Sequence, residues 1–148
     1  MPSDLLPSRS QSLPVPTGDA MYQHTYRTDL SQVRALVLQH AREAGLTEAR
    51  ANDLVLAVSE VAANTLRHTQ ASGTLSFWRD ENEVICEIRD GGTITDPMAG
   101  RRRPAADATG GHGLWLVRQV CDLVELDSGA SGTTIRMHMA IRTADVER

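Results

Sequence analysis

Three polar side chains spaced four residues apart form the first group that could do chemistry: Glu60, Asn64 and His68. On a helix, each step of four residues turns about 400°, so all three share one stripe. An amide oxygen can ligate Mg²⁺, which prefers hard oxygens, and a carboxylate can orient a nucleophile or take its proton. A solvated helix face carries the same residue types, so this stripe alone leaves both interpretations open.

A second group, Asp90-Gly91-Gly92, follows an extended run. Its carboxylate could accept hydrogen bonds from an exocyclic amine such as that of adenine, and its glycines allow the backbone to approach a ligand closely. Asp-Gly is also a common turn, so this motif too is ambiguous when it is taken alone.

The third group, Gly110-Gly111-His112-Gly113, stands where an apolar helical pattern begins. Glycine-rich backbone at a helix N-terminus exposes N–H groups, and the helix dipole favours an anion there, so the motif fits a phosphate site. It is not a Walker A loop, because no Gly-Lys-Ser/Thr follows and the chain contains no lysine.

Apolar periodicity predicts two helices before the second group. The first follows Asp29 or Ser31, either of which could cap it, and runs to about Ala44, where Gly45 is a typical stop. The second spans 47–68 with its first residue, Thr47, as a possible cap. Its predicted inner stripe consists of Leu54, Val58, Val61 and Thr65.

Alternating runs predict the strands that complete the fold. They are Met21–Arg27, Gly73–Arg79, Val84–Arg89, Leu123–Asp127 and Thr133–Ile141. In the second run Leu75 and Phe77 should face the core, with Ser76 and Trp78 on the other side, and Ser128–Gly132 should form a turn. Together with the glycine-opened helix, this order predicts an α+β two-layer sandwich, with a mixed, mostly antiparallel sheet and helices on one face.

The composition fits an ordinary globular domain and argues against several classes. The chain has 148 residues, 41% of them hydrophobic, a formal net charge of −4 and 3% aromatic residues, which disfavours direct nucleic-acid binding. It lacks an apolar run long enough for a membrane helix and an evident signal peptide, so we expect a cytoplasmic protein without membrane contact. Cys86 and Cys121 have no metal-site spacing and are expected to be buried, reduced thiols.

Two segments stand outside the pattern of helices and strands. Residues 1–19 hold four of the six prolines and are expected to be a mobile tail, leaving 20–143 as the folded domain. Residues 93–109 form a polar run of a length usually found in functional lids or disordered segments. Its run Arg101-Arg102-Arg103 fits a solvated loop as well as a contact to phosphate or to a partner.

The order and spacing of these groups resemble the GHKL ATP-binding superfamily and, within it, the bacterial anti-sigma-factor serine kinases. The resemblance covers roughly residues 22–141 and implies the GHKL type of sandwich. Four segments match, in order, the family's N-box, adenine-binding box, second glycine box and closing strand motif: Leu56–His68, Asp90-Gly91-Gly92, Gly111-His112-Gly113-Leu114 and Gly132-Thr133-Thr134.

The resemblance implies a role for each matching residue. Glu60 would be the general base, Asn64 the Mg²⁺ ligand and His68 a residue near the phosphates. Asp90 would bind the adenine amine, with Gly92 beside it. The other implied cofactor-binding positions are Gly111, His112, Gly113 and Leu114 around the phosphates and Thr133 or Thr134 at the adenine end.

By the same resemblance, the protein would be an ATP- and Mg²⁺-dependent serine/threonine kinase. It would phosphorylate a small antagonist protein, sequester a sigma factor and form a homodimer through its first strand and helix. Two departures favour an alternative, a module that binds ATP and a regulatory partner without phosphoryl transfer. Ile94 stands where the adenine box usually has glycine, and no arginine occupies 107–109, just before the second glycine box. Weaker alternatives are a histidine-kinase fragment and a metal enzyme, although the five histidines fit no ligand spacing.

Overall fold

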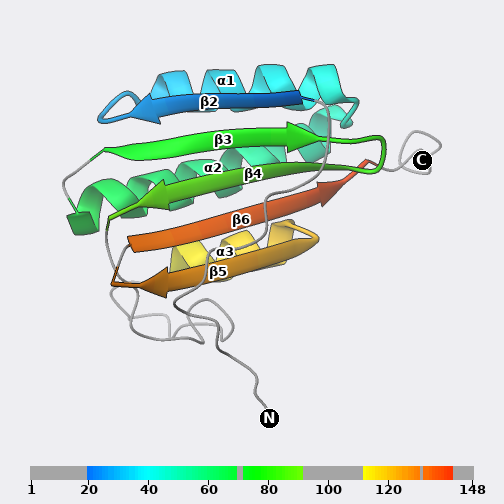
Figure 1. Cartoon of the computed structure of the whole chain (residues 1–148). Helices are drawn as coiled ribbons and strands as arrows, with labels where there is room; N and C mark the ends of the chain where they lie inside the picture. Colours follow the sequence, from blue (N-terminus) through cyan, green and yellow to red (C-terminus); the bar gives the residue numbers. More distant parts are fainter. Residues whose placement is uncertain (1–19, 70–71, 92–111, 131, 142–148) are drawn as a thin grey trace, which may run out of the picture.

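The computed structural model describes residues 20–69, 72–91, 112–130 and 132–141. In this part of the chain five strands and three helices follow one another in the predicted order (Figure 1). The elements are β2 (Ala20–Tyr26), α1 (Leu30–Ala44), α2 (Glu48–Thr69), β3 (Gly73–Arg79), β4 (Glu83–Asp90), α3 (His112–Val120), β5 (Leu123–Gly129) and β6 (Gly132–Ala140). The predicted tail at 1–19 and the polar run at 93–109 lie outside the described residues.

The strands form one sheet in the order β2-β3-β4-β6-β5, and every pairing in the described chain is antiparallel. The sheet is therefore simpler than the mixed one that we expected. All three helices lie on one face of it (Figure 1), which confirms the predicted α+β two-layer sandwich. None of the described helices is long and apolar enough to cross a membrane.

The hydrophobic core lies between the sheet and the helices. Leu54, Val58 and Val61 of α2 are buried in it, as their spacing predicts. The side chain of Thr65, the fourth predicted member of that stripe, lies outside the described ones. The strands contribute Leu75, Phe77, Val84, Cys86, Ile88, Val124, Ile135, Met137 and Met139.

Two of the predicted helix signals are confirmed. Gly45 adopts a left-handed conformation (φ 104°) and ends α1. Thr47 Oγ1 accepts a hydrogen bond of 3.3 Å from the backbone N–H of Arg50, which caps α2. Local sequence is sufficient for both ends, because each cap satisfies backbone groups within its own turn.

The start of α1 differs from the expectation. Asp29 occupies the cap position, but its carboxylate makes no capping hydrogen bond, and Ser31 lies inside the helix. The carboxylate instead accepts a hydrogen bond from the Arg27 N–H (3.0 Å) and lies 3.2 Å from His24 Nε2. These two contacts lower the pKa of Asp29 and close the turn between β2 and α1.

One expectation about the strands is confirmed and one is wrong. Leu75 and Phe77 face the core and Ser76 and Trp78 project away from the helices, as the alternation predicts, although Ser76 and Trp78 are buried as well. The turn between the last two strands is shorter than Ser128–Gly132, because β5 continues to Gly129 and β6 already begins at Gly132. Pairing with a neighbouring strand extends each strand beyond its own apolar pattern.

The two cysteines are buried and unbonded, as predicted. Burial raises the pKa of the Cys86 thiol well above its usual value. Burial, with a smaller contribution from the charge of Asp122, raises the pKa of the Cys121 thiol to about 12. Both thiols are therefore neutral core groups at physiological pH.

Candidate functional site

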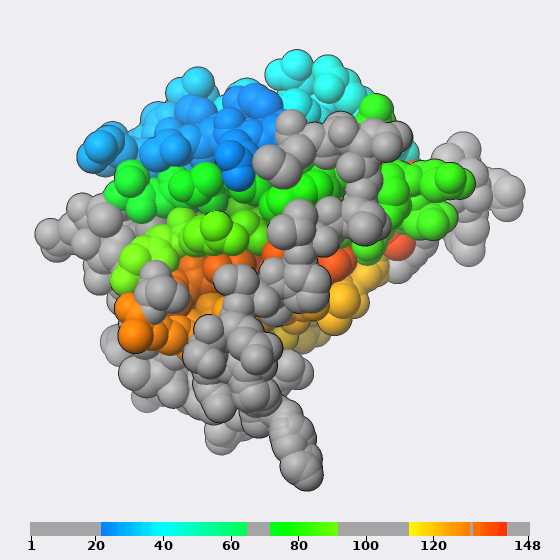
Figure 2. Space-filling view, in the orientation of Figure 1, coloured from blue at the N-terminus to red at the C-terminus, as the bar shows by residue number. Residues whose placement is uncertain are grey.

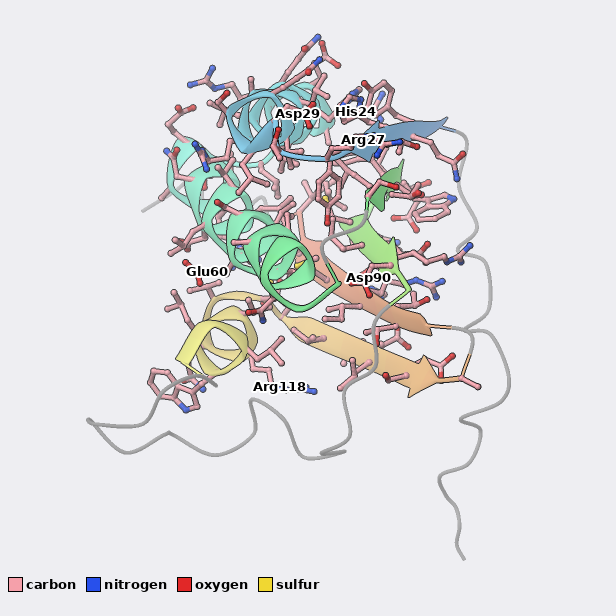
Figure 3. The ribbon with its side chains drawn as sticks, turned by 90° about the vertical axis from the view of Figure 1, so that its left-hand side faces the viewer. His24, Arg27, Asp29, Glu60, Asp90 and Arg118 are labelled. Atoms are coloured by element: carbon pink, nitrogen blue, oxygen red, sulfur yellow. The ribbon has the colours of Figure 1, made fainter. Side chains whose placement is uncertain are left out.

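The predicted site residues come from elements that meet at one end of the sheet. β4 and β5 end there, β6 and α3 begin there, and the last turns of α2 lie behind them (Figure 1). Figure 3 looks onto this end, with Glu60 on α2 and Asp90 at the end of β4. Segments that are far apart in the sequence are thus brought to one edge of the fold.

Three polar residues lie side by side in the last row of the sheet. The register pairs Asp90 of β4 with Thr133 of β6, and Thr133 with Ser128 of β5. Ile88 and Ile135 are buried under the helices, and residues two positions apart on a strand share a face. Asp90 and Thr133 therefore lie on the helix-facing side as well. Thr133 is buried, and its hydroxyl shares a hydrogen bond of 2.7 Å with the Ser128 hydroxyl.

The structure distinguishes between the two threonines of the closing strand motif. Thr133 shares its face with Asp90, whereas Thr134, one residue later, lies on the opposite face in register with Arg89 and Asp127. Only Thr133 is therefore placed beside the candidate adenine-binding carboxylate. Ser128, which the sequence analysis did not single out, joins this row because β5 continues past its apolar segment.

A glycine is required where β6 begins beside Asp90. Gly132 has φ +125°, and a Cβ added there would lie 2.1 Å from the backbone oxygen of Asp90. No L-amino acid with a side chain fits that approach without a shift of the backbone. Gly132 thus fixes the start of β6 against the end of β4, and the row of Asp90 and Thr133 depends on it.

The carboxylate of Glu60 lies against the start of α3. A Cβ added at Gly113, the second residue of that helix, would come within 2.8 Å of Glu60 Oε1. The carboxylate therefore stands beside the first turn of α3, where the helix dipole favours negative charge. The spacing of either motif gave no sign of this contact, which joins the N-box stripe to the second glycine box.

The remaining predicted residues divide into described and undescribed groups. Asn64 lies one turn beyond Glu60 on α2 and is partly buried. Leu114 is buried in the core, so any contact with phosphate would come from its backbone. Outside the description lie Gly92 and Gly111, together with the side chains of His68 and His112.

These groups fit a nucleotide better than an independently bound metal. Asp90 offers an acceptor beside the Thr133 and Ser128 hydroxyls, a combination suited to a heterocyclic amine. The described residues contain no cluster of three or more His, Cys, Asp or Glu side chains that could hold a metal ion. A divalent ion at Asn64 would therefore draw further ligands from water and bound phosphate, as is usual for Mg²⁺.

Comparison with known proteins agrees with this geometry. A search among curated proteins found no match. The sequence model of the histidine kinase-like ATPase domain matches residues 24–139, from within β2 to within β6, and so includes every candidate site residue. Domains of this type bind ATP, generally with Mg²⁺. The chain belongs to the family of histidine kinase-like ATPase domains.

Proposed function

We propose that the protein is an ATP-binding anti-sigma regulatory factor of the cytoplasm. It phosphorylates a serine or threonine of a small antagonist protein and sequesters a sigma factor. The observation that carries the proposal is the contact of Glu60 with Gly113, which places a candidate base at the start of the candidate phosphate-binding helix. The family match supports nucleotide binding, and the motif order supports the choice of kinase and partners.

The adenine end of the site consists of Asp90 and its neighbours. The Asp90 carboxylate accepts hydrogen bonds from the exocyclic amine, while the paired hydroxyls of Thr133 and Ser128 line the row beside it. The two hydroxyls share a hydrogen bond of 2.7 Å, in which either oxygen can be the donor, so the pair can present a donor or an acceptor to a ligand. This arrangement favours a base with a donor group over one that has only acceptors.

The transfer end lies between α2 and α3. Glu60 orients the acceptor hydroxyl and takes its proton, and the first turn of α3 supplies backbone N–H groups to the phosphates. Asn64 would hold Mg²⁺, which, when bound, would supply positive charge to neutralise the phosphates. Phosphoryl transfer depends mainly on such positioning and charge stabilisation.

The second candidate function is ATP-dependent partner binding without phosphoryl transfer. It is favoured by Ile94 and by the lack of an arginine at 107–109, all of which lie outside the described residues. In either case we infer a homodimer that pairs through β2 and α1. Light scattering should then give twice the chain mass, and a monomer mass would contradict it.

Calorimetric titration with Mg·ATP tests the nucleotide site. Asp90→Asn should weaken binding strongly, because the amide loses the negative charge and one of the two acceptor oxygens that the carboxylate offers to the adenine amine and its neighbours. Asp127→Asn is the matched control, since Asp127 lies at the same end of the sheet but on its opposite face. An equal loss of Mg·ATP binding in both variants, or no loss in either, would contradict the assigned role of Asp90.

Glu60→Gln separates the two candidate functions. In a kinase, this variant should bind Mg·ATP normally and lose at least about 100-fold in the rate of γ-phosphate transfer to the antagonist. Asp53→Asn, on the same helix but seven residues before Glu60, should transfer at the normal rate. If the unaltered protein binds Mg·ATP but transfers no phosphate, the second candidate function replaces the first.

A further inference from the structure

The face of the sheet that points away from the helices carries a ladder of charged side chains across three neighbouring strands. We call this side the outer face; it is the near side in Figure 2, where no described helix stands in front of the strands. Alternate residues of these strands, such as Cys86, Val124 and Met137, belong to the core under the helices, so the residues between them project outward. The charge ladder consists of Arg89, Glu87 and Glu83 of β4, Arg136 and His138 of β6, and Glu125 of β5.

Oppositely charged side chains follow one another along the ladder as far as Glu125. Arg89 lies 3.3 Å from Glu87, and Arg136 donates to the same carboxylate at 2.7 Å. The guanidinium of Arg136 also lies 4.0 Å from Glu125. His138 comes next, between Glu125 and the last carboxylate of the ladder. A neutral imidazole would therefore interrupt the alternation of charge.

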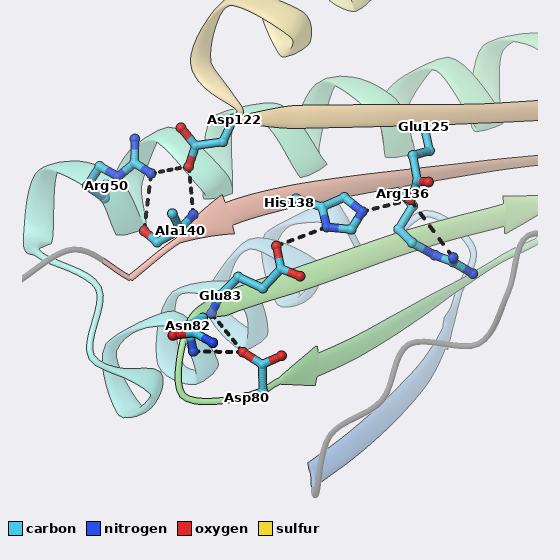
Figure 4. A network of polar contacts seen from close by, with 9 residues as sticks. All are labelled: Arg50, Asp80, Asn82, Glu83, Asp122, Glu125, Arg136, His138 and Ala140. Carbon is cyan, nitrogen blue, oxygen red and sulfur yellow. Dashed lines mark hydrogen bonds and ion pairs between the residues drawn. The ribbon is translucent and has the colours of Figure 1, made fainter.

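Both ring nitrogens of His138 contact a carboxylate (Figure 4). Nδ1 lies 3.1 Å from Glu83 Oε1, and Nε2 lies 2.7 Å from Glu125 Oε1. An ionised carboxylate can only accept, and a neutral imidazole has one N–H and one bare nitrogen. With a neutral ring, one of the two contacts would set two lone pairs against each other. Both contacts are hydrogen bonds only if the imidazole and its two carboxylates together hold one extra proton.

The extra proton belongs to the imidazole. In water a histidine ring takes up a proton at about pH 6.5, whereas a glutamate does so only at about pH 4.3. The ring is therefore the stronger base of the three groups near neutral pH. With an imidazolium at His138, three positive charges balance three carboxylates along the ladder.

The other charged groups around His138 are already engaged. Arg136, two residues earlier on the same face, opposes a second positive charge, but its guanidinium is bound to the central carboxylate of the ladder. Asp80 accepts backbone N–H groups of its own turn, and Asp122 is paired with Arg50 (Figure 4). In the described part of the chain, the two carboxylates in contact with the ring therefore dominate its charge.

We propose that His138 is a proton-dependent clamp that holds the edge strand β5 in the sheet. As an imidazolium it donates to Glu83 of β4 and to Glu125 of β5 at once, across its own strand β6. When the pH rises, one ring nitrogen gives up its proton, and the contact with one carboxylate is lost. In the described chain β5 pairs only with β6 and carries Ser128, so deprotonation loosens the strand that completes the row beside Asp90.

Nitrogen-15 NMR of the unaltered protein at about pH 7 tests the protonation directly. We expect two similar shifts for the ring nitrogens of His138, because both carry a proton in an imidazolium. A neutral ring has one protonated and one bare nitrogen, which give widely separated shifts. His138→Gln identifies the two signals by their disappearance, and Glu125→Gln by their displacement.

Urea unfolding at two pH values tests the clamp. Its stabilisation is complete in weakly acidic solution, where the unfolded chain also carries a charged ring, and it is lost as the folded protein releases the proton at higher pH. The urea midpoint should therefore fall from about pH 6 to about pH 8.5. In Glu125→Gln this fall should shrink by roughly half or more, because the amide can donate to the bare nitrogen of a neutral ring. Glu81→Gln removes the same charge from the exposed turn between β3 and β4 and should leave the fall unchanged.

Three results would overturn the proposal. Widely separated nitrogen shifts at about pH 7 would mean that only one of the two contacts is a hydrogen bond. An undiminished fall of the midpoint in Glu125→Gln would mean that other histidines cause it. An equally diminished fall in Glu81→Gln would show a general effect of surface charge. All of these measurements are made without nucleotide, so their outcome is independent of the proposed function.

Discussion

The two faces of the sheet bury polar groups in different ways. On the helix-facing side, Asp90, Thr133 and Ser128 lie in the last row, beside a glycine and at the edge of the core. On the outer face, Glu87 and Arg136 lie in the middle of the sheet and are paired with each other. The first set lies at the end of the sheet, where Gly132 lets β6 approach Asp90 closely, whereas the second is closed by its own ion pair.

This difference shows how one strand can serve two purposes. β4 alternates between the core residues Cys86 and Ile88 and the outer residue Glu87, and then ends at Asp90. Polar residues in the central rows must be neutralised locally, because water does not reach them. A polar residue in the final row can keep capacity for a ligand, because the sheet ends there. Position along the strand therefore decides which polar residues must be paired within the sheet.

The largest expected effect comes from breaking the buried pair of the outer face. Arg136→Met should lower the free energy of unfolding by about 3–5 kcal/mol, because it leaves the Glu87 carboxylate buried without its main partner. Combining it with Glu87→Leu should recover most of that loss. Urea denaturation measures both variants. A loss below about 1 kcal/mol for the single variant would mean that the pair is solvated rather than closed.

Gly132→Ala should have the next largest effect, at the end of the helix-facing side. The left-handed conformation and the predicted collision with the Asp90 carbonyl should lower the free energy of unfolding by about 1–3 kcal/mol. It should also weaken Mg·ATP binding by moving Asp90. Gly91→Ala is the control for stability, since a Cβ there meets no protein atom within 4 Å. If the two variants lowered the free energy of unfolding equally, the close approach at Gly132 would have no special importance.

Gly113→Ala should change function more than stability. The added Cβ displaces the tip of the Glu60 side chain, which can move, while alanine favours the helix by up to about 1 kcal/mol. We expect the free energy of unfolding to change by less than about 1 kcal/mol and phosphoryl transfer to the antagonist to be lost. In a Glu60→Gln background the same substitution should add little further loss. A fully additive loss would argue that Gly113 acts independently of Glu60.

The smallest effect at neutral pH concerns the thiols of Cys86 and Cys121, which are buried between the sheet and the helices. Because burial raises the pKa of Cys86 and Cys121, both should react slowly with a disulfide reagent in the native protein and rapidly in denaturant. Above pH 9 the unfolded thiols ionise first, so stability should fall between about pH 9 and pH 12. Rapid reaction of the two thiols in the native protein at pH 8 would show that water reaches the helix-facing side of the sheet.

Much of the fold and part of the site could be predicted from local patterns. Helical spacing located α2, and Gly45 and Thr47 marked helix ends whose contacts are made within one turn. The burial of Trp78 could not be predicted, because alternation identifies two faces but does not say what covers each. Ser128 was missed for a similar reason: its place beside Thr133 depends on the register of β5 with β6.

By itself, the sequence determined the order of elements, the helix-facing stripes and the residue types capable of nucleotide chemistry. Those properties follow from backbone periodicity and side-chain chemistry, which act over a few neighbouring residues. Only the tertiary structure decided that Glu60 lies against Gly113, that Thr133 rather than Thr134 shares the face of Asp90, and that a charged pair closes the outer face. Each of these depends on which distant segments pair and in what register, and local sequence does not encode that choice.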